Sequence, residues 1–385
     1  MKSLLLTISF AIVTTLWSPV TQAQTFTVLH SFQFVPDAID PQGGLIMDSL
    51  GNLFGTTLEG GTAFPRCAKG CGTVFTFSTD GHEQVLYSFN VTGSEGQFPN
   101  GPLVLDLSGN FYGTTIGDGG AGWGTIFKLD SSGIATTLHT FTNGFDGSSP
   151  YGGLIRDEIG NFYGTTCQGG RFYLGTIFRL DPAGKLQTMH AFKSLTDGYC
   201  PFGTLVRDPS GNLYGTTSGG GLYNYGTVFK LDNTGTKKLL HSFRGGANGQ
   251  FPYAGLILDS NGNLYGTTAG SYEDSYGTVF KLDKRGKETV LYRFTGGADG
   301  AHPYGGLVRD PSGNLYGTTL DGASFYGTVF EISSRGKFRV LHTFTGSSDG
   351  AFPYASLLRD SLGVIYGTTS GGGDQWSGTL FKIAP

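Results

Sequence analysis

Histidine is the side chain of this 385-residue chain best suited to metal binding, and five of the seven histidines recur in one local context. Each follows Leu or Met in an apolar segment of strand length. They are His30, His139, His190, His241 and His342, and Tyr87 and Tyr292 take the same position in two further segments. A position that accepts either ring is typical of packing by a flat side chain with a polar tip, so we predict no metal site from these residues.

The four cysteines could form disulfides or, alternatively, bind zinc. Cys67 and Cys71 bracket three residues of a longer loop, which favours a local bridge across that loop. Cys167 and Cys200 lie in two successive connections between strands, and connections of these two types lie on the same face if the repeats form a ring of blades. We therefore predict a second bridge between Cys167 and Cys200.

Aromatic and acidic side chains on glycine-rich connections are the candidate ligand-binding residues. Aromatic faces stack on apolar ligand surfaces, and carboxylates accept hydrogen bonds. The predicted set is Tyr173, Tyr223, Tyr272, Phe325, Trp376, Glu59, Asp118, Asp274, Asp321 and Asp374. The alternative is that these aromatic rings only cover the edges of the fold.

A second aromatic series follows prolines, at Tyr151, Phe202, Tyr253, Tyr304 and Tyr354. Because it repeats so regularly, we expect these rings to pack against a neighbouring repeat at the mouth of a central channel. No linear motif of a metalloprotease, serine hydrolase or phosphate-binding loop is present. The sequence therefore identifies no catalytic residue, and we expect no cofactor.

Two short motifs recur through the chain and define the elements that carry these residues. Gly-Thr-Thr begins at Gly55, Gly113, Gly164, Gly215, Gly266, Gly317 and Gly367. Gly-Thr-(Val/Ile/Leu)-Phe follows each copy, beginning at Gly72, Gly124, Gly175, Gly226, Gly277, Gly327 and Gly378. The spacing of roughly 51 residues indicates seven structural repeats.

Each repeat holds four apolar segments of strand length, which we term a, b, c and d. The a–b connections read Asp-x-x-Gly-Asn, as in 208–212, and several c–d connections read Asp-x-x-Gly. Asp and Gly in these positions are typical of hairpin turns, and the carboxylates are too sparse for calcium loops. The sequence thus predicts four antiparallel strands per repeat.

The chain ends favour a closed ring over an open solenoid. Residues 27–32 form a lone d segment before any a segment, and the last repeat stops after its c segment at 379–383. One end therefore carries the strand that the other lacks. We predict an all-β, seven-bladed β-propeller of four-stranded blades, in which the N-terminal strand completes the last blade.

The first 23 residues have the pattern of a secretory signal peptide: Lys2, an apolar run from Leu4 to Trp17, and small residues before Gln24. A retained membrane anchor is the alternative, but the run is short for a bilayer span. We expect residues 24–385 to form one secreted domain, extracellular or periplasmic, without a membrane span. With 25 basic and 29 acidic residues and no basic cluster, nucleic acid is not an expected partner.

The string Asn-Leu-Tyr-Gly-Thr-Thr, a Gly-rich stretch and Tyr-Gly-Thr-Val-Phe-Lys-Leu, over 212–231, resembles the GloVer (Gloeo/Verruco) tandem repeat of bacterial secreted and surface proteins. The resemblance extends over nearly all of 24–385 and implies a repeat architecture and a location outside the cytoplasm. Members often carry a C-terminal sorting anchor; residues 381–385 do not show its pattern, so the resemblance does not lead us to expect retention at the cell surface. The family implies no catalytic residues.

The leading functional hypothesis is a monomeric, non-catalytic binding protein that uses one propeller face for a polysaccharide or a protein. The face that bears the b–c and d–a connections is the expected site, because its loops vary most between repeats. One alternative is a metal-assisted hydrolase or lyase with its site in the central channel. Another is a passive scaffold.

Overall fold

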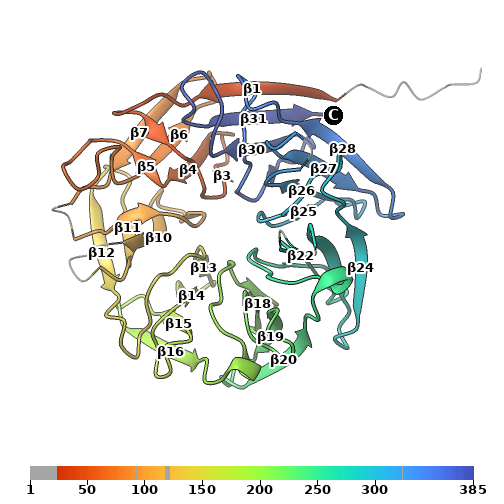
Figure 1. Cartoon of the computed structure of the whole chain (residues 1–385). Helices are drawn as coiled ribbons and strands as arrows, with labels where there is room; N and C mark the ends of the chain where they lie inside the picture. The colour runs from red at the N-terminus through yellow and green to blue at the C-terminus, as the bar shows by residue number, and fades with distance from the viewer. Residues whose placement is uncertain (1–23, 92–93, 118–121, 272, 274, 323) are drawn as a thin grey trace, which may run out of the picture.

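In the computed structural model the chain forms a ring of seven blades around a central channel (Figure 1). The structure describes residues 24–91, 94–117, 122–271, 273, 275–322 and 324–385. The predicted signal peptide therefore lies outside the described residues. The predicted fold class and strand number per blade are confirmed.

The strands of each blade follow one another outward from the channel, except in the last blade. Blade 1 contains β3 (Ile46–Met47), β4 (Leu53–Thr57), β6 (Thr73–Phe77) and β7 (Glu83–Ser88). Blade 2 contains β8 (Gln97–Pro99) and β9 (Val104–Leu105), which both pair with β10 (Phe111–Gly117), then β11 (Thr125–Leu129) and β12 (Ala135–Thr140). Blade 3 contains β13 (Ile155–Arg156), β14 (Phe162–Thr166), β15 (Thr176–Leu180) and β16 (Leu186–Ala191). Blade 4 contains β17 (Val206–Arg207), β18 (Leu213–Thr217), β19 (Thr227–Leu231) and β20 (Lys237–Ser242).

The remaining blades repeat this order. Blade 5 contains β21 (Ile257–Leu258), β22 (Leu264–Thr268), β23 (Thr278–Leu282) and β24 (Glu288–Arg293). Blade 6 contains β25 (Val308–Arg309), β26 (Leu315–Thr319), β27 (Thr328–Ile332) and β28 (Phe338–Thr343). Blade 7 contains β29 (Leu358–Arg359), β30 (Ile365–Thr369), β31 (Thr379–Ala384) and the N-terminal β1 (Thr25–Ser31). The short strands β2 (Ala38–Ile39) and β5 (Glu59–Gly60) pair with each other, and η1 (Leu195–Asp197) and η2 (Gly246–Asn248) are single 3₁₀ turns.

The ring closes where the two chain ends meet. Strand β1 pairs antiparallel with β31, from Thr25 opposite Ala384 to Ser31 opposite Thr379. Figure 1 shows the red N-terminal strand lying outside the blue C-terminal one. Closure by the N-terminal strand, predicted from the chain ends, is confirmed.

The Gly-Thr-Thr motif has a packing reason, seen in blade 4. A Cβ atom on Gly215 would lie 2.7 Å from Cζ of Phe229 and 2.8 Å from Cδ2 of Leu205, so only glycine leaves room for the ring from the next strand. The Thr216 hydroxyl donates to the carbonyl of Ala254 in blade 5 (3.0 Å), and the Thr217 and Thr227 hydroxyls bond each other (2.7 Å). The motif thus joins strand b both to strand c and to the next blade.

The hydrophobic core lies between neighbouring blades. Phe192 of blade 3 and Phe229 of blade 4 are fully buried, with ring centroids 5.6 Å apart in an edge-to-face arrangement. Leu205, Leu213 and Leu231 of blade 4 complete the same cluster. Each blade therefore depends on its neighbour for burial of its apolar face.

The a–b connections are hairpin turns, as the sequence predicts. Asp208 accepts hydrogen bonds from the backbone N–H groups of Ser210 and Asn212, both at 2.9 Å, and from the Tyr214 hydroxyl at 3.0 Å. Gly211 has a φ of 84°, which favours glycine. The Asp carboxylates of these turns are therefore engaged by their own loops.

Both predicted disulfides are present, Cys67–Cys71 and Cys167–Cys200. The second joins the b–c connection of blade 3 to the loop that enters blade 4. Within the described residues, no helix has the length and apolar character to cross a membrane.

Candidate functional site

The b–c and d–a connections meet on one face, which we call the loop face. Short bridges pair them directly, for example Ser148 with Gln168 and Ala301 with Asp321. In all seven blades the residue before the proline of the d–a loop has a positive φ of 51° to 59°. Phe251 shows the effect: its N–H donates to Tyr225 O of blade 4 (2.9 Å), and its carbonyl accepts from Ala269 N–H of blade 5 (3.1 Å). These two hydrogen bonds fix the chain so that the proline and the residue after it point toward the channel.

The residues after these prolines surround the channel on the loop face, and we call this opening the mouth. In chain order they are Gln42, Asn100, Tyr151, Phe202, Tyr253, Tyr304 and Tyr354. All seven are half-buried. They enclose a cavity of about 300 Å³, whose lining includes every one of these side chains except Tyr253.

The five aromatic residues form a continuous arc, because each ring contacts the next. Tyr151 stacks on Phe202 with centroids 4.4 Å apart, and Phe202 meets Tyr253 edge-to-face at 5.4 Å. Tyr253 stacks on Tyr304 at 5.0 Å, and Tyr304 stacks on Tyr354 at 5.1 Å. The rings therefore pack against the neighbouring blade, as the sequence predicts, and they line the cavity as well. Because neighbouring rings cover most of one another's faces, contact from the cavity side would be made mainly with ring edges.

The two remaining positions form a polar arc. Asn100 Nδ2 donates to Gln42 Oε1 at 3.4 Å, and Gln42 Nε2 donates to the Asp40 carboxylate at 3.0 Å. Burial raises the pKa of Asp40 to about 6. Burial also raises the pKa of Tyr354 to about 12, with smaller effects from the Tyr253 and Tyr151 hydroxyls and the Asp40 carboxylate. The mouth thus combines an aromatic arc with a hydrogen-bonding arc.

The predicted aromatic residues of the b–c loops lie elsewhere on the loop face. Tyr173 and Phe325 are the most exposed, at 71% and 75%, and Tyr223 and Trp376 are about half exposed. Each belongs to a different blade, and within the described part of the chain no ring contact joins any two of them. Tyr272 lies outside the described residues. These four side chains are therefore separate exposed rings rather than one patch.

Two of the three predicted carboxylates that the structure describes have local partners. Glu59 forms an ion pair with Lys69 (3.1 Å), and Asp321 lies 2.7 Å from Nδ1 of the buried His302. Asp374 is exposed in its loop. Asp118 and Asp274 are outside the described residues. None of these three described carboxylates lines the cavity at the mouth.

A larger groove of about 630 Å³ lies on the opposite face, between blades 1 and 2. Its lining combines apolar side chains such as Phe54, Leu86 and Leu107 with turn residues Asp48 and Asp106. Both carboxylates already accept hydrogen bonds from the backbone of their own turns. These two carboxylates therefore already have partners in their own turns.

The five recurring histidines, together with Tyr87 and Tyr292, occupy seven equivalent places that we call the outer seams. At six seams the His or Tyr of a d strand meets an acidic residue of the d–a loop, and at the seam of His241 the equivalent residue is Asn248. One side chain from the outer strand of the next blade completes each group. His139 lies 3.0 Å from Asp146, His190 3.1 Å from Asp197 and His342 3.1 Å from Asp349, each seven residues later. The sequence analysis did not recognise this His-x₆-Asp spacing, although the spacing is visible in the sequence and indicates that the two side chains meet.

The side chain from the next blade differs among the seams. The equivalent positions, each paired with the last residue of its strand c, are Phe26, Glu83, Ala135, Leu186, Lys237, Glu288 and Phe338. Phe26 and Phe338 stack on His342 and Tyr292, with centroids 3.6 and 3.9 Å apart. Burial, reinforced by the Asp37 carboxylate, raises the pKa of Glu83 to about 8.

The seam of blades 4 and 5 makes stability depend on pH, because Glu288 is 87% buried there, 3.4 Å from His241. Burial raises the pKa of Glu288 to about 7, against opposing effects of Arg244 and Arg293, and lowers that of His241 to about 4. A carboxyl whose folded pKa exceeds its unfolded value destabilises the fold increasingly from about pH 4.5 to 7. We expect Glu288→Gln to raise the free energy of unfolding by roughly 2 kcal/mol more at pH 8 than at pH 5.

Urea unfolding of both proteins between pH 5 and 8 measures this difference. Glu158→Gln, at an exposed glutamate paired only with Arg207, is the control and should give a pH profile parallel to wild type. Parallel profiles for Glu288→Gln would contradict the prediction.

Comparison with solved structures shows the same fold. The extracellular domain of a protein described as a hybrid two-component system from B. thetaiotaomicron matches 93% of this chain with a TM-score of 0.62 and 11% identity. A second structure, described as the extracellular domain of a one-component system from the same organism, gives 0.61 over 93% of the chain, with 10% identity. This chain spans only 39% and 40% of those two structures.

A protein described as a 6-phosphogluconolactonase from Bacteroides uniformis matches 78% of this chain and 84% of its own length, with a TM-score of 0.50 and 16% identity. At such identities these matches show the propeller fold alone. A search of curated protein sequences finds no match.

The repeat itself is matched directly by a family model. The model described as the Gloeobacter/Verrucomicrobia repeat matches residues 13–221 and again residues 203–385, so the two matches together extend over nearly the whole chain. They contain all seven Gly-Thr-Thr motifs and the strands built on them. The chain belongs to the Gloeobacter/Verrucomicrobia repeat family.

Proposed function

We propose that this chain is a secreted, non-catalytic binding protein that holds a sugar unit of a glycan at the mouth. The observation that carries the proposal is the pairing of the aromatic arc with Gln42 and Asn100 around a cavity of about 300 Å³, where Asp40 accepts a hydrogen bond from the Gln42 amide behind the lining. A cavity of this size is at the lower end for small-ligand sites, which suits one or two sugar rings.

The chemistry of the lining matches a hydroxyl-rich ligand. The amide groups of Gln42 and Asn100 offer acceptors and donors, and the tyrosine hydroxyls offer both. The aromatic edges contact the apolar C–H surface of a sugar ring. An export route is supported by the two disulfides, which form in oxidising compartments, and the extracellular origin of two structural neighbours agrees with it.

Binding is tested on the mature protein with a panel of oligosaccharides, first by thermal shift and then by calorimetry for any positive ligand. A ligand that binds only the folded state raises the melting temperature. We expect Gln42→Ala and Tyr354→Phe each to weaken binding about 10-fold, since each removes one hydrogen-bonding group in a half-buried site. Ile134→Ser, an exposed residue in a c–d turn on the opposite face, is the control and should bind as wild type.

Two results would contradict this site. If no glycan binds, the ligand class is wrong. If binding survives Gln42→Ala and Tyr354→Phe but is lost in Tyr173→Ala or Trp376→Ala, the exposed loop aromatics carry the function instead.

The second candidate is a hydrolase or lyase with its site in the channel. It is favoured by Asp40, because a carboxyl with a pKa of about 6, bonded to the mouth residue Gln42, can transfer a proton near neutral pH. Incubating the protein with any bound oligosaccharide distinguishes the two functions. Cleavage that Asp40→Asn abolishes would favour the enzyme, whereas an unchanged ligand supports the binding protein.

A further inference from the structure

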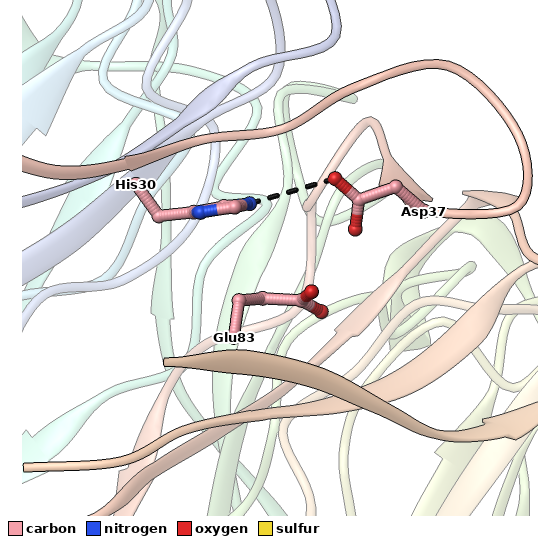
Figure 2. A group of neighbouring side chains, drawn as sticks. All are labelled: His30, Asp37 and Glu83. Carbon is pink, nitrogen blue, oxygen red and sulfur yellow. Dashed lines mark ion pairs between the residues drawn. The ribbon is translucent and has the colours of Figure 1, made fainter. Parts of the chain in front are cut away.

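The seam where the ring closes differs chemically from the other six. There His30 of β1, Asp37 of the loop after it and Glu83 of β7 point toward one another (Figure 2). One ligand atom from each side chain lies within 4.8 Å of the others, and His30 Nε2 is 3.5 Å from Asp37 Oδ2. These three residues are the only such group of His, Cys, Asp or Glu among the residues that the structure describes.

Two atoms of this group are buried without a hydrogen-bond partner, His30 Nε2 and Glu83 Oε1. A buried polar atom without a partner costs free energy. Asp37 uses its carboxylate for the backbone N–H groups of Gln33 (2.8 Å) and Ala38 (2.7 Å), which fixes its position beside His30. The fold therefore holds acceptor atoms around one point and leaves two of them unsatisfied.

The seam of blades 3 and 4 shows which kind of group can occupy the equivalent place next to a His-Asp pair. Lys237 occupies the position of Glu83, and its ammonium group, 4% exposed, lies 2.7 Å from Asp197 Oδ1 next to His190. A cation thus sits beside the His-Asp pair in blade 3. At the closing seam the same place faces two carboxylates, and no lysine or arginine of the described residues pairs with either.

The ligand types restrict which cation fits. Carboxylate oxygens alone would suit calcium or magnesium, but an imidazole nitrogen favours zinc and related transition metals. In a tetrahedral zinc site with bonds of about 2 Å, ligand atoms lie roughly 3.3 Å apart. The His30–Asp37 distance is already close to this value, and a small movement of the longer Glu83 side chain brings the third ligand in.

We propose that His30, Asp37 and Glu83 bind one zinc-class divalent ion, which clasps the N-terminal strand of blade 7 to the outer strand of blade 1. Its three ligands come from two segments that only ring closure brings together. Binding is therefore coupled to closure and raises the stability of the whole domain.

The test uses the mature protein without a histidine tag, stripped with EDTA and titrated with Zn²⁺ by calorimetry and by thermal melting. We expect one equivalent of Zn²⁺ to bind and the melting temperature to rise, with EDTA reversing the rise. Glu83→Gln and His30→Gln should each weaken zinc binding at least 10-fold. Glu288→Gln is the matched control, because it makes the same change at a seam where Asn248 replaces the aspartate, and it should bind zinc as wild type.

Glu83→Lys adds an independent measurement, since it copies the arrangement around Lys237. We expect this variant to bind no zinc and to melt, without metal, near the temperature of the zinc-loaded wild type. Two results would overturn the site: a wild-type protein that takes up no stoichiometric zinc, or a Glu83→Gln variant that binds zinc as tightly as wild type. Absorption bands of bound Co²⁺, present in wild type and absent in Glu83→Gln, would support it.

Discussion

Deleting residues 24–31, and with them strand β1, is expected to abolish cooperative folding of the propeller. The strand supplies the fourth strand of blade 7, and Phe26 stacks on His342 at 3.6 Å and packs against Phe381 at 5.4 Å. Without it β31 becomes an exposed edge and the ring stays open. The loss should exceed about 5 kcal/mol, which is comparable with the whole stability of a typical domain. Urea unfolding and size-exclusion chromatography measure the outcome.

Adding the missing strand as a peptide separates closure from a general truncation effect. A synthetic peptide of residues 24–32, supplied in excess, should restore part of the unfolding transition by pairing with β31. Removal of Pro385 alone, which forms no pair in the sheet, is the control and should leave stability unchanged. A truncated protein with the unfolding midpoint of wild type would show that closure by β1 is dispensable.

Phe229→Ala is expected to cost about 4 kcal/mol of unfolding free energy. The ring is fully buried between blades 3 and 4, where it packs on Phe192 and fills the space that Gly215 leaves. Because the glycine cannot collapse into the vacated volume, most of the cavity should remain. Chemical denaturation of the mature protein measures the change.

Phe172→Ala is the matched control, because the same side chain is 45% exposed in the b–c loop of blade 3. It should change stability by less than about 0.5 kcal/mol. A cost below about 1 kcal/mol for Phe229→Ala would mean that the neighbouring blades repack around the gap, and would refute the rigid inter-blade core.

Fold and closure could be predicted because their signals are local and repeated. Turn residues such as Asp208 and Gly211 act within five residues, and each strand pairs with its neighbour along the chain. Closure of the ring could also be predicted from the sequence, since a lone d strand at one end of the chain matches the missing d strand at the other. The Cys67–Cys71 disulfide was local to one loop, and the Cys167–Cys200 disulfide followed from the two loop types sharing a face.

The candidate site was less accessible to sequence reasoning. Loop composition pointed to Tyr173, Tyr223, Phe325 and Trp376, but these rings stay apart because neighbouring blades diverge away from the channel axis. The repeated Pro-Tyr positions were interpreted as packing, and they also line a cavity because the same positions converge toward the axis. Gln42 and Asn100 went unnoticed, since only the ring reveals them as members of the same series.

The sequence by itself determined the repeat, the four strands of each blade and the number of blades, because these depend on contacts between segments that follow one another along the chain. It also determined the closing strand, because the first segment of the chain is the one that the last repeat lacks. Only the tertiary structure decided that Gln42 and Asn100 join the five aromatic residues at the mouth, and which side chains meet at the outer seams. His30 and Glu83 belong to different blades, and Asp40, Gln42 and Asn100 join two blades. Such groups form only because the ring places equivalent positions of the repeats at the same distance from the channel axis. Their chemistry comes from the few positions at which the repeats differ in residue type.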